Sequence, residues 1–185
     1  FDPEPMTDAD HQANRQRVQQ EAGGTLALLR ERLAQLAPAA QSDAQSLLER
    51  SDVLLARIEA AGGNMSGGIK TRYHGDFHLG QVLVSGNDFI LIDFEGEPAR
   101  SFAERRAKGS ALRDVAGMLR SFDYARWAAL QHASERGQDN APLMVAANTW
   151  VSSCRRAFLQ AYGERIADAP ASSTPDAGQL TLFEL

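Results

Sequence analysis

A short polar loop followed by two apolar runs is the feature that most constrains how this chain folds. The loop spans residues 73–81 (YHGDFHLGQ), and the apolar runs are residues 82–84 and 89–92. Between the runs, residues 85–88 (SGND) form a turn signal, because glycine and asparagine tolerate the left-handed backbone of tight turns. The sequence therefore predicts a β-hairpin whose two ends lie close together, with Asp93 directly after its second strand.

The polar residues at the two ends of this hairpin suit phosphoryl transfer. That reaction needs an acceptor hydroxyl held in place, its proton accepted, and the phosphate charge neutralised by Mg²⁺. Asp76, a carboxylate on the loop, suits the first two tasks and is the candidate catalytic residue. Gln81 offers a carbonyl oxygen and Asp93 a carboxylate, so these two are the candidate Mg²⁺ ligands.

Four further residues are candidates for supporting roles. His74 is expected to brace the backbone around Asp76 rather than to take part in the chemistry. For His78 the sequence leaves open whether it contacts substrate, packs or is exposed. Glu95 either binds metal or substrate or belongs to a solvated acidic turn. Asp114, in the first turn of an expected helix, either caps that helix or hydrogen-bonds the backbone of the loop.

A competing interpretation makes His74, Asp76 and His78 ligands of one metal ion, because alternate residues of a strand share a face. The glycines in and after this segment favour a loop instead of a strand. The two other histidines of the chain complete no recognisable zinc cluster.

The composition excludes some classes of protein. A net charge of −5 argues against a nucleic-acid binder, whose affinity comes largely from Lys and Arg. No apolar run approaches the roughly 20 residues that cross a bilayer. Cys154 is the single cysteine, so no internal disulfide forms and a cytoplasmic location is expected.

Helical periodicity dominates the segment before the loop. Thr7 and Asp10 form a capping-box pattern that starts a helix, and Gly23-Gly24 predicts a kink or break. Leucines then recur at helical spacing up to Pro38. A second capping box at Ser42 is expected to open another helix, so that residues 7–61 form a helical hairpin.

Helices are also expected after the hairpin. Alternation predicts a short strand over residues 69–73, and helical stripes follow at 110–137 and 140–162, the second ended by Gly163. The aromatic residues of these helices, Tyr124, Trp127 and Trp150, are expected mainly in the core, with sugar contact as the alternative. The fold class is therefore mainly α with a small β-hairpin (α+β).

The predicted organisation is one domain over residues 1–168 followed by a tail. The domain contains the helical hairpin, the loop and β-hairpin over residues 69–95, and the helices over residues 110–163. Residues 169–185 begin with a stretch rich in Pro, Ser and Ala and are expected to be a flexible, truncated tail. Both ends of the chain look cut, which suggests a piece of a longer protein.

The loop HGDFHLGQ resembles the catalytic loop of aminoglycoside phosphotransferase-like kinases, usually HGDxHxxN. The string from Ile92 to Ala125 (IDFEGEPARSFAERRAKGSALRDVAGMLRSFDYA) is similar more narrowly to maltokinases, in particular to the module fused behind trehalose synthase. The strong match covers Tyr73 to Ala125, and the flanking helices fit only by pattern.

The resemblance implies the C-terminal lobe of a protein-kinase-like fold that transfers the γ-phosphate of ATP to maltose. Asp76 would match the catalytic aspartate, Gln81 and Asp93 the Mg²⁺-binding positions, and Asp114 a structural aspartate. His78 and Glu95 are the weaker candidates for sugar contact. A trehalose synthase domain is a possible partner on the same chain.

Two departures from the pattern limit these expectations. Gln81 is one methylene longer than the usual Asn, and no Gly-rich phosphate loop or Val-Ala-x-Lys strand precedes the motif. The N-terminal lobe is therefore missing, and the isolated chain is expected to be inactive. Alternatives are a kinase for an aminoglycoside or choline, and a non-catalytic sugar-binding or scaffold fragment.

Overall fold

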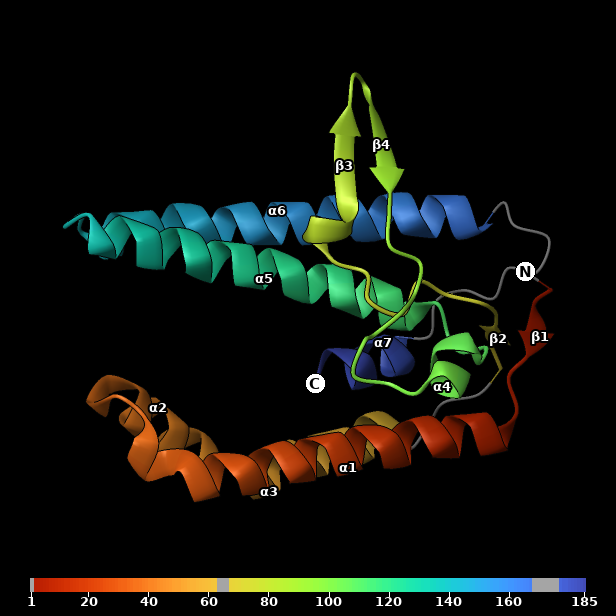
Figure 1. Ribbon diagram of the computed structural model, residues 1–185, viewed down its shortest axis with the longest axis horizontal. Helices are drawn as coiled ribbons and strands as arrows, with labels where there is room; N and C mark the ends of the chain where they lie inside the picture. The colour runs from red at the N-terminus through yellow and green to blue at the C-terminus, as the bar shows by residue number, and fades with distance from the viewer. Residues whose placement is uncertain (1, 63–66, 168–176) are drawn as a thin grey trace. The chain divides into compact units, whose positions relative to one another are not determined.

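The structure is a computed structural model that describes residues 2–62, 67–167 and 177–185 of the 185 in the chain. The described residues are mostly helical, with two small two-stranded sheets, which confirms the expected mixture of helices and one hairpin (Figure 1). They divide into two compact units instead of one domain with a tail. The first contains residues 2–5, 68–167 and 184, and the second contains 6–62, 67, 177–183 and 185.

The second unit is built around a helix that continues where a break was predicted. Helix α1 (Asp8–Arg32) begins with the predicted capping box, in which Thr7 and Asp10 exchange hydrogen bonds. It then runs through Gly23-Gly24 without interruption, so the predicted kink is wrong. A glycine costs only about 1 kcal/mol in a helix. The burial of Leu26 beyond the glycines helps offset that cost.

The next two helices also differ from the prediction. After a 3₁₀ turn (η1, Leu33–Gln35), α2 (Pro38–Glu49) starts at the proline and not at Ser42. Proline is well suited to the first helical position because its missing N–H needs no partner there. The helix ends at Glu49 with Arg50 as its C-cap, and α3 (Ser51–Gly62) follows.

The expected tail contains a helix that completes the core of the second unit. Helix α7 (Ala177–Glu184) buries Leu182 completely against Ile58 of α3, which is also fully buried. The prediction of flexibility is therefore wrong for residues 177–185, while residues 168–176 lie outside the described part. Helix α3 packs along α1 and lies directly behind it in Figure 1.

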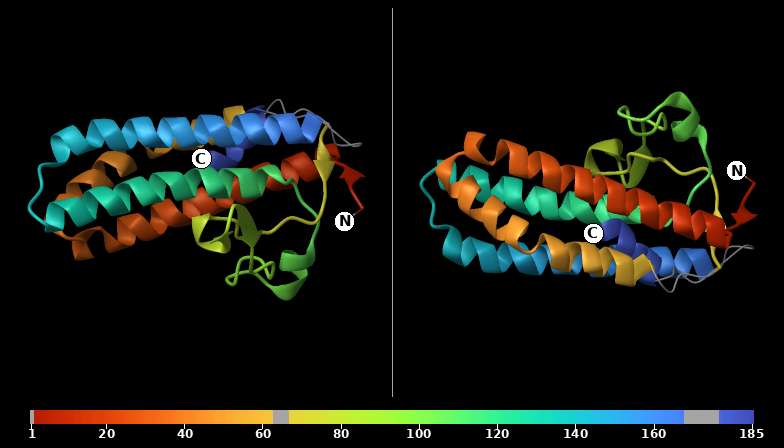
Figure 2. Two further views of the ribbon diagram at one scale, coloured as in Figure 1. Left: turned by 90° about the horizontal axis from the view of Figure 1, so that it is seen from above. Right: turned by 90° about the horizontal axis from the view of Figure 1, so that it is seen from below.

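In the first unit, α5 (Leu112–Glu135) and α6 (Asn140–Ala167) form an antiparallel pair (Figures 1 and 2). The predicted stripe on α5 is confirmed as its buried face, and Phe122 meets the rings of Trp150 and Phe158 edge-on. Helix α6 continues past Gly163, contrary to the predicted stop. Apart from its own helix backbone and chain neighbours, no described atom lies within 4 Å of a Cβ built at Gly163, so no packed group ends the helix there.

The remaining elements of the first unit are short. Strand β1 (Glu4–Pro5) pairs with β2 (Ile69–Lys70), which is shorter than the predicted strand over residues 69–73, although Thr71 still forms a bridge to Gly109. A five-residue helix that was not predicted, α4 (Phe102–Arg106), starts at a Ser101–Glu104 capping box.

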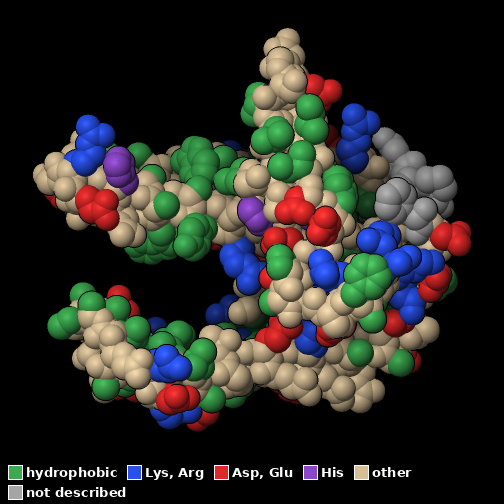
Figure 3. Space-filling view, viewed as in Figure 1, with side chains coloured by type: hydrophobic (Ala, Val, Ile, Leu, Met, Phe, Trp, Pro, Cys, Tyr) green, Lys and Arg blue, Asp and Glu red, His purple; other side chains and the backbone are tan. Residues whose placement is uncertain are grey.

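The predicted β-hairpin is confirmed. Strand β3 (Val82–Ser85) pairs antiparallel with β4 (Asp88–Leu91), and Gly86 adopts the left-handed conformation (φ 62°) in the turn. Its apolar side chains are largely exposed, Val84 to 75% and Phe89 to 67%, and hydrophobic side chains are visible on the projecting hairpin in the space-filling view of Figure 3. None of the described helices is long and apolar enough to span a bilayer.

Candidate functional site

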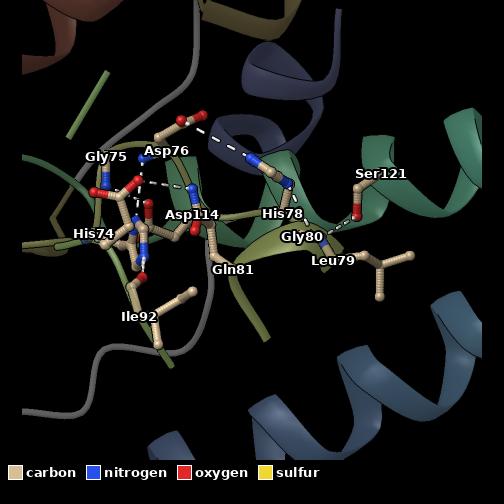
Figure 4. Close-up of polar contacts among 11 residues, drawn as sticks. His74, Gly75, Asp76, His78, Leu79, Gly80, Gln81, Ile92, Asp114 and Ser121 are labelled. Carbon is tan, nitrogen blue, oxygen red and sulfur yellow. Dashed lines mark hydrogen bonds and ion pairs between the residues drawn. The ribbon is translucent and has the colours of Figure 1, made fainter. Parts of the chain in front are cut away.

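His74 connects the two ends of the motif. Its side chain is buried, and Nε2 donates a hydrogen bond to the carbonyl oxygen of Ile92 at 2.8 Å. Its Nδ1 accepts from the amide of Asp76 at 3.4 Å, which assigns the neutral tautomer with hydrogen on Nε2. The ring also lies 4.8 Å from that of Phe94. One side chain thus ties the backbone beside Asp76 to the residue preceding Asp93 (Figure 4).

Two glycines allow the segments around the two aspartates to approach closely. Gly75 has φ +87° and Gly96 has φ +80°, a region that other residues rarely adopt. A Cβ built on Gly75 would lie 3.2 Å from the Cα of Gly96. The backbone before Asp76 therefore lies in close contact with the loop after Asp93. This agrees with the prediction that the two ends of the β-hairpin lie close together.

Asp114 holds the start of the loop from helix α5. Its two carboxylate oxygens accept hydrogen bonds from the backbone amides of His74 at 2.6 Å and Gly75 at 2.9 Å (Figure 4). Of the two roles that the sequence left open, these contacts fit the brace for the loop backbone. Burial raises the pKa of Asp114 above its usual 3.8, against the opposing effect of the two amides.

The negative charge of Asp114 also affects the pKa of Tyr162, a second titratable group in the same unit. Burial, followed by the nearby charge of Asp114, raises the pKa of Tyr162 on α6 above its ordinary value of 10.0. The phenol therefore stays neutral over the whole physiological range.

Gln81 and Asp93 lie side by side. The amide Nε2 of Gln81 donates to Oδ2 of Asp93 at 3.3 Å, and the Gln81 side chain is buried. The backbones are linked as well, since the amide of Ile92 donates to the carbonyl of Gln81 at 3.1 Å. Asp93 has φ 62°, a left-handed conformation that is uncommon outside glycine and is enriched at functional sites.

These two residues fit a magnesium site by their chemistry. A carboxylate and a side-chain amide are the oxygen donors that Mg²⁺ accepts, and Mg²⁺ usually keeps several waters beside one or two protein ligands. Turning the Gln81 amide by 180° would present its carbonyl oxygen beside Oδ2 of Asp93. Their roles as metal ligands stay a prediction.

Asp76 projects from the loop toward His78. Nε2 of His78 lies 3.9 Å from Oδ2 of Asp76, and the two side chains are 44% and 31% exposed. The other ring nitrogen of His78 accepts from the amide of Gly80 at 3.0 Å and so caps the 3₁₀ turn η2 (Leu79–Gln81). The Asp76 carboxylate therefore lies near His78 and is partly open to a substrate hydroxyl.

Some sequence candidates do not join this arrangement. The Glu95 carboxylate is exposed, and its backbone carbonyl accepts from Arg105 at 3.5 Å. Over the described ranges, no group of three or more His, Cys, Asp or Glu is placed to hold a metal. The three-ligand alternative also requires a free nitrogen on His74, yet both ring nitrogens contact backbone atoms. Tyr124 and Trp127 are 79% and 55% exposed, so the expectation of core packing is wrong for them. Trp150 is 45% exposed, and its ring packs edge-on against the buried Phe122.

Sequence reasoning missed two residues that contact the loop. Gly117 on α5 lies against the carbonyl of Phe77, and Ser121 accepts a hydrogen bond from the amide of Leu79 at 3.2 Å. Both residues lie within the string of residues 92–125, but the sequence alone gave neither of them a role. The one signal for them is their spacing of three and seven residues from Asp114, which places all three on one helix face.

The curated proteins described here as similar in sequence to this chain are both glucosamine kinases. Glucosamine kinase of Streptacidiphilus jiangxiensis is 32% identical over 108 residues, which are 58% of this chain and 23% of that protein. Glucosamine kinase of Mycolicibacterium smegmatis is 30% identical over 112 residues, which are 60% of this chain and 26% of that protein. The chain thus spans about a quarter of these relatives' length.

Solved structures match over nearly the whole chain. A glucosamine kinase in complex with glucosamine, ADP and inorganic phosphate superposes with a TM-score of 0.72 at 27% identity, covering 99% of this chain and 42% of that one. A glucosamine kinase in crystal form B superposes with a TM-score of 0.73 at 27% identity, covering 99% of this chain and 40% of that one. The model of the Phosphotransferase enzyme family (APH) matches residues 6–166, and the chain therefore belongs to that family.

Proposed function

We propose that this chain is the C-terminal, acceptor-binding lobe of an ATP- and Mg²⁺-dependent kinase that phosphorylates a hydroxyl group of a sugar. The observation that supports this most directly is the His74 bridge. It links the backbone of Asp76 to Ile92, directly before Asp93. A hydroxyl-orienting carboxylate and a metal-binding carboxylate held in one place are what phosphoryl transfer requires.

Each residue then has a defined task. The Asp76 side chain is partly exposed, so a substrate hydroxyl can reach it. Asp76 orients this hydroxyl and accepts its proton late in the reaction. Gln81 and Asp93 would hold Mg²⁺, which when bound neutralises the charge of the transferring phosphate. Asp114 and His74 keep the loop backbone in place, and His78 lies beside Asp76 where it can contact the substrate.

The proposal also includes ATP as the phosphate donor and a nucleotide-binding lobe outside this chain. A solved neighbour contains ADP, which supports ATP as the phosphate donor. Because the chain covers about two fifths of the solved neighbours, we assign the activity to a longer protein that includes an N-terminal, nucleotide-binding lobe. Alone, the chain is expected to show little or no turnover.

Two sugars are candidates for the acceptor. The relatives described above are glucosamine kinases, which favours glucosamine. The resemblance of residues 92–125 to maltokinases favours maltose, although none of the relatives described above has that name. A single experiment separates these two and also covers the non-sugar acceptors considered from the sequence.

The test uses the full-length protein that contains this chain, with Mg-ATP and a panel of glucosamine, maltose, glucose, kanamycin and choline. ADP release gives the rate, and mass spectrometry of the product identifies the phosphorylated compound. Transfer to glucosamine or maltose with a clear preference supports the proposal. Transfer to kanamycin or choline without transfer to a sugar refutes the acceptor class, and no transfer to any hydroxyl refutes the kinase assignment.

A further inference from the structure

One face of helix α5 contacts the catalytic loop at three successive points. Asp114, Gly117 and Ser121 are spaced three and four residues apart, so they line one side of the helix over roughly 10 Å. Their contacts on the loop follow the same order along the chain, at His74-Gly75, Phe77 and Leu79. The loop is therefore laid along the helix from its start to the turn that leads to Gln81.

The contact at Gly117 leaves no room for a side chain. A Cβ built on Gly117 would lie 2.7 Å from the carbonyl oxygen of Phe77, closer than real Cβ contacts come. Phe77 directly follows Asp76, and its carbonyl belongs to the backbone, so it cannot rotate away alone. Any larger residue at position 117 must push the peptide next to the catalytic carboxylate away from the helix.

The contact at Ser121 is a directed hydrogen bond. The hydroxyl donates to the carbonyl of Met118 in its own helix at 2.8 Å, which uses its hydrogen. Its oxygen then accepts from the amide of Leu79 at 3.2 Å, the first residue of η2 (Figure 4). This bond holds the end of the loop from which Gln81 follows two residues later.

We propose that Gly117 and Ser121 are positioning residues for the phosphotransfer, with Gly117 setting the place of Asp76 and Ser121 the place of Gln81. This inference rests on the proposed function. The three contacts reach backbone atoms of the loop, and none of them buries an apolar side chain. The effect of substitutions at Gly117 and Ser121 should therefore fall on catalysis more than on folding.

The test compares four variants of the full-length protein that contains this chain. Gly117→Ala should lower kcat by about 10- to 100-fold with KM values for sugar and Mg-ATP within about threefold, because misplacing a reacting group by about 1 Å has that effect. Ser121→Ala should lower kcat by roughly 3- to 10-fold, as expected for one hydrogen bond lost. It should also speed hydrogen exchange in peptides that contain Leu79.

Two matched controls lie on α6. Gly163→Ala changes a helical glycine whose Cβ meets nothing within 4 Å, and Ser152→Ala removes a hydroxyl that donates to Asn148 of its own helix. Both should keep kcat within about twofold of the wild type. Equal kcat losses in test and control variants, or losses that track the melting temperature, would overturn the positioning role.

The proposed function and the positioning role can fail separately. If the wild-type protein phosphorylates no hydroxyl, the proposed function is refuted, and the amide exchange of Leu79 in Ser121→Ala still decides whether α5 anchors the loop. If the wild type is active and Gly117→Ala keeps full kcat, the positioning role of Gly117 is refuted while the kinase assignment stands. Unchanged exchange around Leu79 together with full kcat refutes the role of Ser121.

Discussion

Replacing Asp114 by asparagine tests how strongly α5 holds the catalytic loop. The carboxylate accepts two short backbone hydrogen bonds, at 2.6 and 2.9 Å. Asparagine has one carbonyl oxygen, so one bond is lost and an NH₂ group faces the second amide. A hydrogen bond to a charged group contributes about 1.5–3 kcal/mol, and relief of the buried charge offsets part of it. We expect Asp114→Asn to lower the free energy of unfolding by about 1–2 kcal/mol at neutral pH.

The pH dependence of this loss follows from the raised pKa of Asp114. A carboxyl whose pKa is raised on folding stabilises the folded state most when protonated, below pH 3.8, and that contribution is lost as the pH rises through the folded pKa. Asparagine does not titrate. The stability advantage of the wild type over Asp114→Asn should therefore shrink as the pH rises above 3.8.

Urea unfolding followed by tryptophan fluorescence suits this measurement. The two tryptophans of the chain, Trp127 and Trp150, lie on α5 and α6 of the unit that contains the site. Asp123→Asn is the control. Asp123 is a half-exposed aspartate on the same helix that pairs with Arg126 and Arg155, and losing such solvated ion pairs should change stability by less than about 1 kcal/mol. Equal losses in the two variants, or an advantage that grows with pH, would refute the reasoning.

Three further outcomes are expected. In the full-length protein, Asp76→Asn should lower kcat by roughly 10²- to 10⁴-fold with sugar binding mostly kept, as measured by steady-state kinetics and calorimetry; near-normal turnover would remove Asp76 from the mechanism. Asp93→Asn should keep the fold, because asparagine tolerates the left-handed backbone at φ 62°, but should lose Mg²⁺-dependent turnover; wild-type rates at low Mg²⁺ would argue against Asp93 as a ligand. Ile58→Ala should destabilise the second unit by about 2–5 kcal/mol, because Ile58 is fully buried against Leu182, and far-UV circular dichroism during urea unfolding would measure it; a loss below about 1 kcal/mol would contradict that packing.

Sequence patterns predicted the structure correctly where the interactions involve residues close together in the chain. The capping box at Thr7, the turn between Val84 and Phe89 and the buried stripe on α5 all form as predicted. Each depends on backbone preferences or periodicity within a few residues. The boundaries at Gly23, Ser42 and Gly163 were wrong because a single glycine or a capping pattern is a weak local preference. At α2 the proline at position 38 was the stronger start signal.

Burial of isolated apolar residues was harder to predict. Leu182 follows a stretch rich in Pro, Ser and Ala, a composition typical of flexible segments. It is nevertheless buried against Ile58, which lies more than a hundred residues earlier in the chain. Trp127 has the size and helical spacing of a core residue, yet it is largely exposed. In both cases the deciding contact, or its absence, involves distant parts of the chain.

The amino-acid sequence by itself determined the residues of the motif, the hairpin that returns the chain from Asp76 to Asp93, and the helix that carries Asp114, because turn chemistry and periodicity act over short distances. Only the tertiary structure decided that Gly75 touches Gly96 and that Gly117 admits the Phe77 carbonyl. Close approach of two backbones depends on where both segments lie in space, and a glycine in the sequence does not say what it faces.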